Sequence, residues 1–126
     1  MKVNRSDSEV DVYNTAIQAR LRPRVATIAD AATITPTSDT ADEYTVTALA
    51  QTALVDTPSG TPTNGQKLLI RVIDNGTART LSWSSNYTAI DVSLPLTTVV
   101  SKYLYVGCIY NSTTSKWDVV AVGQQT

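Results

Sequence analysis

The chain has 126 residues, of which 42% are hydrophobic and 17% are charged, and its formal net charge at pH 7 is −1. This composition fits a single folded domain and excludes a disordered chain, and no run approaches the ~20 apolar residues of a membrane-spanning helix. The chain has no histidine and one cysteine, Cys108. These counts exclude a disulfide within the chain and argue against the many enzymes and metal sites that use histidine.

Charge is unevenly distributed along the chain. Residues 1–25 hold five basic and three acidic residues, and the remainder holds five basic and eight acidic residues. An acidic domain forfeits the counterion release that supplies affinity for nucleic acid, so we expect no nucleic-acid partner. The N-terminus lacks the apolar stretch of a secretory signal, and we expect neither a membrane partner nor a cofactor.

The first 24 residues differ from the rest in their residue pattern. Val10, Tyr13, Ile17 and Leu21 recur at spacings of three, four and four residues, and Pro23 would end a helix. A short amphipathic helix and an extended arm are both consistent with this pattern, and a lone helix of this length needs another surface to become ordered. The candidate partner-binding residues are Val10, Tyr13, Ile17, Arg20, Leu21, Arg22 and Arg24.

Residues 25–126 form the predicted folded domain, and their pattern is typical of β-structure. Ser and Thr make up about a quarter of the chain and alternate with aliphatic residues in short runs. "VATIADAATIT" predicts one or two early strands. "EYTVTALA" places Tyr44, Val46 and Ala48 on one face of a strand and Thr45 and Thr47 on the other.

The middle of the domain contains a long loop and an apolar strand. Residues 57–66, "TPSGTPTNGQ", carry two prolines and two glycines and predict a loop. "KLLIRVID" is largely apolar on both faces, so we expect another surface to cover the second face. Asn75-Gly76 after it predicts a tight hairpin turn into "RTLSWS".

The C-terminal stretch "YLYVGCIYNSTTSKWDVVAVG" predicts two strands around a polar turn, and "YTAIDVSL" predicts another strand before Pro95. Many short strands without an amphipathic helix between them indicate an all-β domain. We predict an antiparallel, jelly-roll-like β-sandwich over residues 25–126, preceded by an N-terminal arm or short helix over residues 1–24.

Two groups of residues could carry chemistry. Asp39, Asp42 and Glu43 could serve as a carboxylate pair for glycoside hydrolysis or as calcium ligands, but their setting favours a solvated turn, and we expect neither catalysis nor a metal. Exposed aromatic rings could stack on sugars, whereas the absence of Phe favours Trp83 and Trp117 as core residues. The aromatic candidates are Trp83, Tyr87, Tyr103, Tyr105, Tyr110 and Trp117.

Two long stretches resemble a module of tailed-bacteriophage structural proteins, which include head-decoration, head-fibre and tail-fibre proteins. They are "PSGTPTNGQKLLIRVIDNGTARTLSWSSNY" and "SKYLYVGCIYNSTTSKWDVVAV", and the resemblance covers roughly residues 25–123. Its most specific parts are Thr63-Asn64-Gly65-Gln66, Ser82-Trp83, and Tyr110-Asn111-Ser112 leading to Lys116-Trp117.

The resemblance implies a non-enzymatic component of the virion, often a homotrimer, built on a β-sandwich. It leaves residues 1–24 outside the match as the attachment segment. The first hypothesis is a capsid decoration protein whose partners are further copies of itself and the major capsid or other virion proteins. A receptor- or glycan-binding domain of a head or tail fibre is the alternative, and a glycan-cleaving enzyme is the weakest hypothesis.

Overall fold

The computed structural model describes residues 22–126, and their regular secondary structure is entirely β-strand. Within this part of the chain, no helix is long and apolar enough to cross a membrane. The strands are β1 (Val25–Ile28), β2 (Thr33–Ile34), β3 (Glu43–Leu49), β4 (Ala53–Val55), β5 (Lys67–Asp74), β6 (Leu81–Trp83), β7 (Tyr87–Ala89), β8 (Leu104–Asn111) and β9 (Lys116–Gln124).

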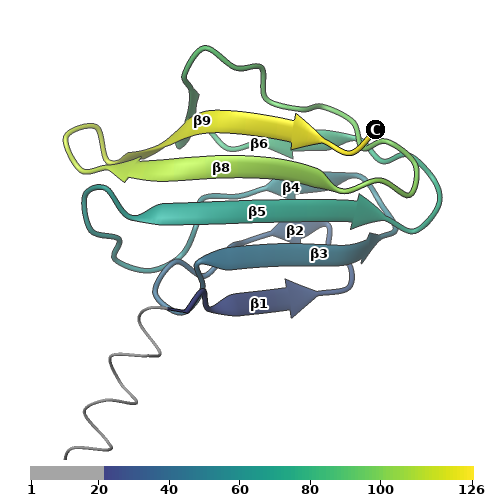
Figure 1. Cartoon of the computed structure of the whole chain (residues 1–126), viewed down its shortest axis with the longest axis horizontal. Coiled ribbons are helices and arrows are strands. Elements are labelled where there is room, and N and C mark those ends of the chain that lie inside the picture. The colour runs from purple at the N-terminus through teal and green to yellow at the C-terminus, as the bar shows by residue number, and fades with distance from the viewer. Residues whose placement is uncertain (1–21) are drawn as a thin grey trace, which may run out of the picture.

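The strands form two sheets, and the first six strands alternate between them. The larger, six-stranded sheet has the order β1-β3-β5-β8-β9-β7, and the smaller, three-stranded sheet has the order β2-β4-β6. Each pass from one sheet to the other and back completes a coil, so β1, β3 and β5 lie parallel in the larger sheet and β2, β4 and β6 lie parallel in the smaller one (Figure 1). Residues 25–83 are therefore a short two-sided coil of parallel strands.

The C-terminal part departs from this coil. Strand β8 runs antiparallel to β5, β9 runs antiparallel to β8, and β7 lies parallel to β9 at the edge of the larger sheet. The β8–β9 hairpin turns at residues 112–115, where Ser115 has a φ of 56°. This hairpin confirms the antiparallel pair that the sequence predicts for residues 103–123.

The all-β class is confirmed, but the antiparallel arrangement is wrong for most of the strand pairs. Only β5–β8 and β8–β9 are antiparallel among the paired strands of residues 22–126. Alternation of apolar and polar residues shows which side of a strand faces the core, but it is the same for parallel and antiparallel neighbours. The relative direction of neighbouring strands depends on the connections between them, and the connections between β1 and β6 cross to the opposite sheet.

The hairpin predicted at Asn75-Gly76 is also wrong. Gly76 has a φ of 103° and its N–H donates to Asp74 Oδ1 at 3.0 Å, so a turn does form there. However, β5 pairs with β3 and β8, whereas β6 pairs with β4 in the other sheet. Six residues separate the two strands. They carry the chain from the larger sheet to the smaller one, where Leu81 packs into the core.

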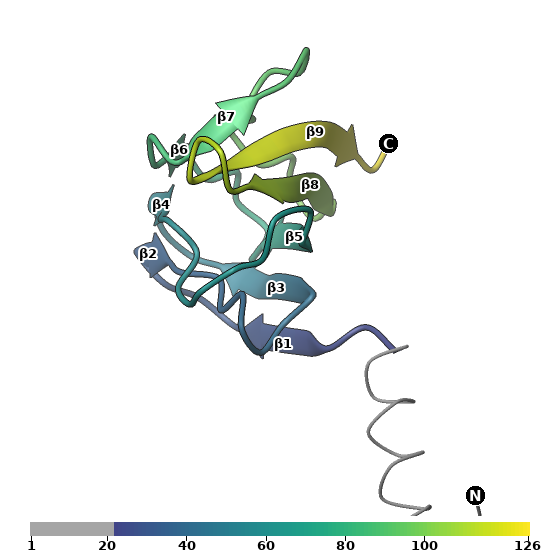
Figure 2. The same cartoon turned by 90° about the vertical axis from the view of Figure 1, so that its left-hand side faces the viewer.

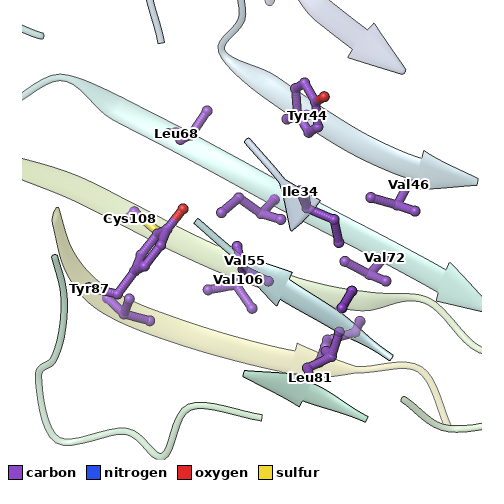
Figure 3. Packing of buried hydrophobic residues seen from close by; sticks show 14 of the residues in the cluster. Ile34, Tyr44, Val46, Val55, Leu68, Val72, Leu81, Tyr87, Val106 and Cys108 are labelled. Carbon is purple, nitrogen blue, oxygen red and sulfur yellow. The ribbon is translucent and has the colours of Figure 1, made fainter. Parts of the chain in front are cut away.

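The two sheets face each other (Figure 2), and the buried hydrophobic residues of both sheets form one core. Figure 3 shows side chains of the larger sheet, such as Leu68 and Val106, facing Val55 and Leu81 of the smaller sheet. In β5, Leu68, Ile70 and Val72 are buried on this side, as the period-two pattern predicts. Trp117 is 2% exposed and belongs to the same core, which confirms its predicted packing role.

The long loop between β7 and β8 is fixed by the carboxylate of Asp74. Asp74 accepts hydrogen bonds from Thr98 Oγ1 at 2.7 Å, from the Ser101 N–H at 2.9 Å and from the Gly76 N–H at 3.0 Å. Burial opposes ionisation, but these hydrogen bonds lower the pKa of Asp74 below its ordinary value. One buried carboxylate thus ties two loops to the end of β5.

Candidate interaction surface

The outer face of the larger sheet carries one charged and aromatic group in its centre, here called the Arg71 cluster (Glu43, Thr45, Arg71, Tyr103 and Tyr105). Arg71 pairs with Glu43 and donates from Nε to Thr45 Oγ1 and from Nη1 to Tyr105 Oη, both at 3.3 Å. Its guanidinium carbon lies 5.3 Å from the centre of the Tyr103 ring and 5.6 Å from that of Tyr105.

The cluster has a clear origin in strand register. Thr45, Arg71 and Tyr105 are directly paired across β3, β5 and β8, so their side chains point to the same face. Thr45 is only 2% exposed although it points outward. The hydrogen bond with Tyr105 is the largest cause that raises the pKa of Arg71; burial opposes it, and the nearby charge of Glu43 adds to it, so the side chain remains a cation.

Beside the cluster lies an open depression of about 530 Å³, here called the hollow. Gly107 lacks a side chain and pairs with Leu69 one row along from Arg71, which leaves the surface low at this point. Ile109 and Val120 add apolar walls, and Val120 is 43% exposed. The residues that line the hollow are Asp42, Gly65, Gln66, Lys67, Leu68, Leu69, Gly107, Cys108, Ile109 and Val120.

The N-terminal junction is clamped at the rim of the hollow. The Arg24 N–H donates to Asp42 Oδ2 at 2.8 Å, and Arg24 Nη2 contacts Asp42 Oδ1 at 2.9 Å. Arg24 Nη1 also donates to the backbone oxygen of Asp39 at 2.8 Å. The hydrogen bond from the Arg24 side chain lowers the pKa of Asp42, which therefore remains a carboxylate at neutral pH.

Among the predicted partner-binding residues, the structure describes two. Arg22 is exposed, and Arg24 is held by Asp39 and Asp42 as part of the domain. The arginine clamp was not predicted, although the pairing of a basic "RPR" segment with the acidic "DTADE" segment is a signal that the sequence contains. The other five residues lie outside the described part of the chain: Val10, Tyr13, Ile17, Arg20 and Leu21.

The acidic segment has structural partners for all three carboxylates. Asp39 Oδ1 accepts a hydrogen bond from the Thr61 N–H at 2.9 Å, Asp42 pairs with Arg24, and Glu43 pairs with Arg71. Residues 38–40 form the predicted turn. Within residues 22–126 there is no group of three or more acidic, cysteine or histidine side chains placed to hold a metal ion.

The aromatic candidates divide between the core and the outer face. Trp117 packs edge-on against Tyr110 with ring centres 5.2 Å apart, and Trp83 packs against Tyr87 at 5.1 Å. The indole N–H of Trp83 donates to the Pro95 oxygen at 2.7 Å. Tyr103 and Tyr105 instead lie half-exposed in the Arg71 cluster, with ring centres 6.3 Å apart.

The most specific motifs of the phage-like resemblance contact each other. The Gly65 N–H donates to the Tyr110 oxygen at 2.8 Å, and the Ser112 N–H donates to Asn64 Oδ1 at 3.0 Å. Gln66 also donates from Nε2 to the Ser38 oxygen at 2.8 Å. Thr63-Asn64-Gly65-Gln66 and Tyr110-Asn111-Ser112 therefore join the start of β5 to the end of β8.

The chain was compared with known protein families, curated proteins and solved structures. No protein-family model, no curated protein and no solved structure matches the chain.

Proposed function

We propose that the chain is a non-enzymatic structural protein of a tailed-phage virion, a capsid decoration protein that attaches through its N-terminal residues. The resemblance of residues 25–123 to phage structural modules supports this role. The single observation that carries the attachment mechanism is the clamp at Arg24, which joins the N-terminal segment to a rigid sheet.

A fixed junction matters because docking costs conformational freedom. If the attachment segment left the domain through a loose linker, docking would have to restrict both the segment and the domain. Arg24 makes side-chain contacts with Asp42 and Asp39, and its oxygen accepts hydrogen bonds from the Asp42 and Glu43 N–H groups at 2.7 and 3.1 Å. The segment therefore leaves the domain at one defined point, beside β1.

Assembly as a homotrimer fits this role. The outer face of β5 carries Leu69 and Ile73, and Leu96, Val99 and Val100 are exposed elsewhere on the domain. Apolar surface of this kind marks interaction sites, and a ring of three copies would bring three attachment segments to one virion site. A jelly-roll connection is not needed for decoration, because a two-sheet core of either connectivity supplies a rigid body.

Co-sedimentation with empty capsids tests attachment, and light scattering tests the oligomer. The full chain is compared with a variant that lacks residues 1–21 and keeps the Arg24 clamp. We expect a trimer in both cases and sedimentation with capsids only for the full chain. Attachment of the truncated variant would overturn the role of the N-terminal segment, and a monomeric full chain would overturn the trimer.

A receptor- or glycan-binding fibre domain is a second candidate, and the Arg71 cluster supports it. Tyr103 and Tyr105 offer two aromatic rings beside a guanidinium on an open sheet face, and sugar rings stack on such surfaces. Binding of the wild type to host cells, reduced by Tyr103→Ala, would favour this function over decoration. Equal capsid binding by Tyr103→Ala and wild type would favour decoration.

A further inference from the structure

Two Asn-Gly pairs lie at opposite ends of β5, Asn64-Gly65 before it and Asn75-Gly76 after it. All four residues are exposed, and the side on which either glycine would carry a Cβ faces open space. An asparagine before a glycine is open to attack by its own backbone, because the glycine has no side chain to keep its nitrogen away. Both pairs are therefore candidates for spontaneous chemistry, and their hydrogen-bond partners distinguish them.

The pair after β5 lies between two charged side chains. Arg79 Nη2 donates to Asn75 Oδ1 at 2.8 Å, so a guanidinium bonds to the side-chain carbonyl. The Gly76 N–H donates to Asp74 Oδ1 at 3.0 Å, so a carboxylate bonds to the backbone amide that follows. A positive group therefore polarises the carbonyl of Asn75, and a negative group contacts the nitrogen beside it.

The pair before β5 has neutral partners in the same two places. The Ser112 N–H donates to Asn64 Oδ1 at 3.0 Å, and the Gly65 N–H donates to the Tyr110 oxygen at 2.8 Å. The two pairs thus share sequence, exposure and number of hydrogen bonds, and they differ in the charge of their partners. Asn64 is an internal control for the chemistry of Asn75.

We propose that Asn75 is a self-modification site, at which the chain converts the side-chain amide into a carboxylate with the help of Arg79 and Asp74. The Gly76 nitrogen attacks Asn75 Cγ, an N–Cγ bond forms, and the Cγ–Nδ2 bond breaks. The proton of the Gly76 N–H leaves with Nδ2 as ammonia, and a cyclic imide remains. Solvent water then opens the imide by adding hydroxyl to a carbonyl carbon and a proton to the nitrogen, which leaves aspartate or isoaspartate at position 75.

Each charged partner assists the first step. Negative charge develops on Asn75 Oδ1 as the nitrogen adds, and the Arg79 guanidinium stabilises that charge. The Asp74 carboxylate draws on the Gly76 N–H and makes the nitrogen a better nucleophile. This N–H lies in the plane of the peptide group, so the hydrogen bond leaves both faces of the nitrogen open to the Asn75 carbon.

The product also supplies a partner for a donor that lacks one. Among the side chains of residues 22–126 that are not exposed, Arg79 Nε is the one buried nitrogen or oxygen without a hydrogen-bond partner. Nε and Nη2 lie on one edge of the guanidinium, where the two oxygens of a carboxylate can accept from both. The Asn75 amide offers a single oxygen, which already accepts from Nη2. A carboxylate at position 75 provides the second oxygen.

Peptide mapping by mass spectrometry tests the proposal on the wild-type chain. The chain is incubated at pH 7 in water enriched in heavy oxygen, which labels each new carboxyl group, and conversion of Asn75 and Asn64 is followed in the same sample. We expect Asn75 to convert at least about tenfold faster than Asn64 in the folded chain. In guanidinium chloride the two rates should become similar, because neither residue keeps its partners. Equal rates in the folded chain, or faster conversion of Asn64, would overturn the proposal.

Charge variants then test the role of Arg79. Arg79→Gln should slow Asn75 to about the rate of Asn64, and Arg79→Lys should restore part of the difference because it keeps the charge. An unchanged Asn64 rate verifies that the domain stays folded, and Arg22→Gln, at an exposed residue, should change neither rate. Faster conversion of Asn75 in Arg79→Gln would show that Arg79 protects the amide, and would overturn the proposal.

An NMR comparison tests the pairing in the product. Asn75→Asp supplies the carboxylate directly, and the Nε–H signal of Arg79 should then move downfield as it gains an acceptor. Asn64→Asp adds the same charge at the other end of β5 and should leave that signal in place. An unmoved signal in Asn75→Asp would overturn the assignment of Arg79 Nε as the partner of the new carboxylate.

Discussion

The two faces of the larger sheet are built from alternate residues of the same strands, yet they are stabilised in different ways. The inner face is apolar, and residues such as Ile70, Val106 and Val119 have no exposed surface. The outer face mixes the Arg71 cluster with the hollow and is only partly covered. The inner face supplies the stability of the fold, while the outer face leaves apolar and charged groups partly exposed.

The largest effect is expected from a truncation on the inner face. Trp117→Ala removes a ring that is 2% exposed and leaves a cavity against Tyr110. We expect a loss of about 3–5 kcal/mol in the free energy of unfolding. Urea denaturation measures this loss, with the exposed Leu96→Ala variant as a control that should stay within about 0.5 kcal/mol. Equal effects of the two variants would refute the assignment of Trp117 to the core.

The next effect concerns a buried charge at the end of β5. Asp74→Asn weakens three hydrogen bonds to the carboxylate, and we expect a loss of about 1–3 kcal/mol in unfolding free energy at pH 7. The folded-state pKa of Asp74 is lowered, so its ionised form stabilises the fold above the unfolded value of about 3.9. That contribution disappears as the pH falls through the folded-state pKa.

The free energies of unfolding at pH 7 and at pH 3 therefore separate the effect of the Asp74 charge from the effect of its side-chain geometry. The difference between wild type and Asp74→Asn should narrow at the lower pH, because Asp74 of the unfolded wild-type chain takes up a proton below its unfolded pKa of about 3.9, and folding must then release that proton. Asp91→Asn, at an exposed position, serves as the matched control. A difference that stays constant between the two pH values would show that ionisation of Asp74 does not stabilise the loop.

A smaller effect is expected on the outer face. The side chains of Arg71 and Glu43 are 28% and 18% exposed, so their ion pair is partly shielded from water. Arg71→Met should cost on the order of 1 kcal/mol in unfolding free energy, and a double-mutant cycle with Glu43→Gln isolates the pair. A coupling free energy near zero would leave Arg71 as a packing residue alone.

The sequence predicts the faces of strands better than their partners. The alternation in "KLLIRVID" correctly places Leu68, Ile70 and Val72 toward one side, because a side chain's face depends only on its position along a strand. The polar turn before Lys116 correctly predicts the final hairpin, because both of its strands are neighbours in sequence. Local patterns are sufficient for these features.

The parallel coil and the outer-face sites depend on contacts that are distant in sequence. Val25, Glu43 and Leu69 become neighbours only through connections that cross the core. The Arg71 cluster similarly joins residues of β3, β5 and β8, and the hollow depends on Gly107 lying between Leu69 and Ala121. No role was predicted for Arg71, because its partners on β3 and β8 cannot be read from the spacing of residues along one strand.

The smallest effect is expected at the rim of the outer face, where the Arg24 clamp joins the N-terminal segment. The side chains of Arg24 and Asp42 are 45% and 37% exposed, so water and salt screen their attraction. Arg24→Gln should cost no more than about 0.5 kcal/mol in unfolding free energy, and the cost should vanish in high salt. The same variant should still loosen the junction at Arg24, which would appear as faster hydrogen exchange at the Asp42 and Glu43 N–H groups that bond to the Arg24 oxygen. Unchanged exchange at these groups would mean that the backbone contacts alone hold the junction. A loss of stability as large as that of a core truncation would contradict the expectation that the exposed Arg24 side chain contributes little to the free energy of unfolding.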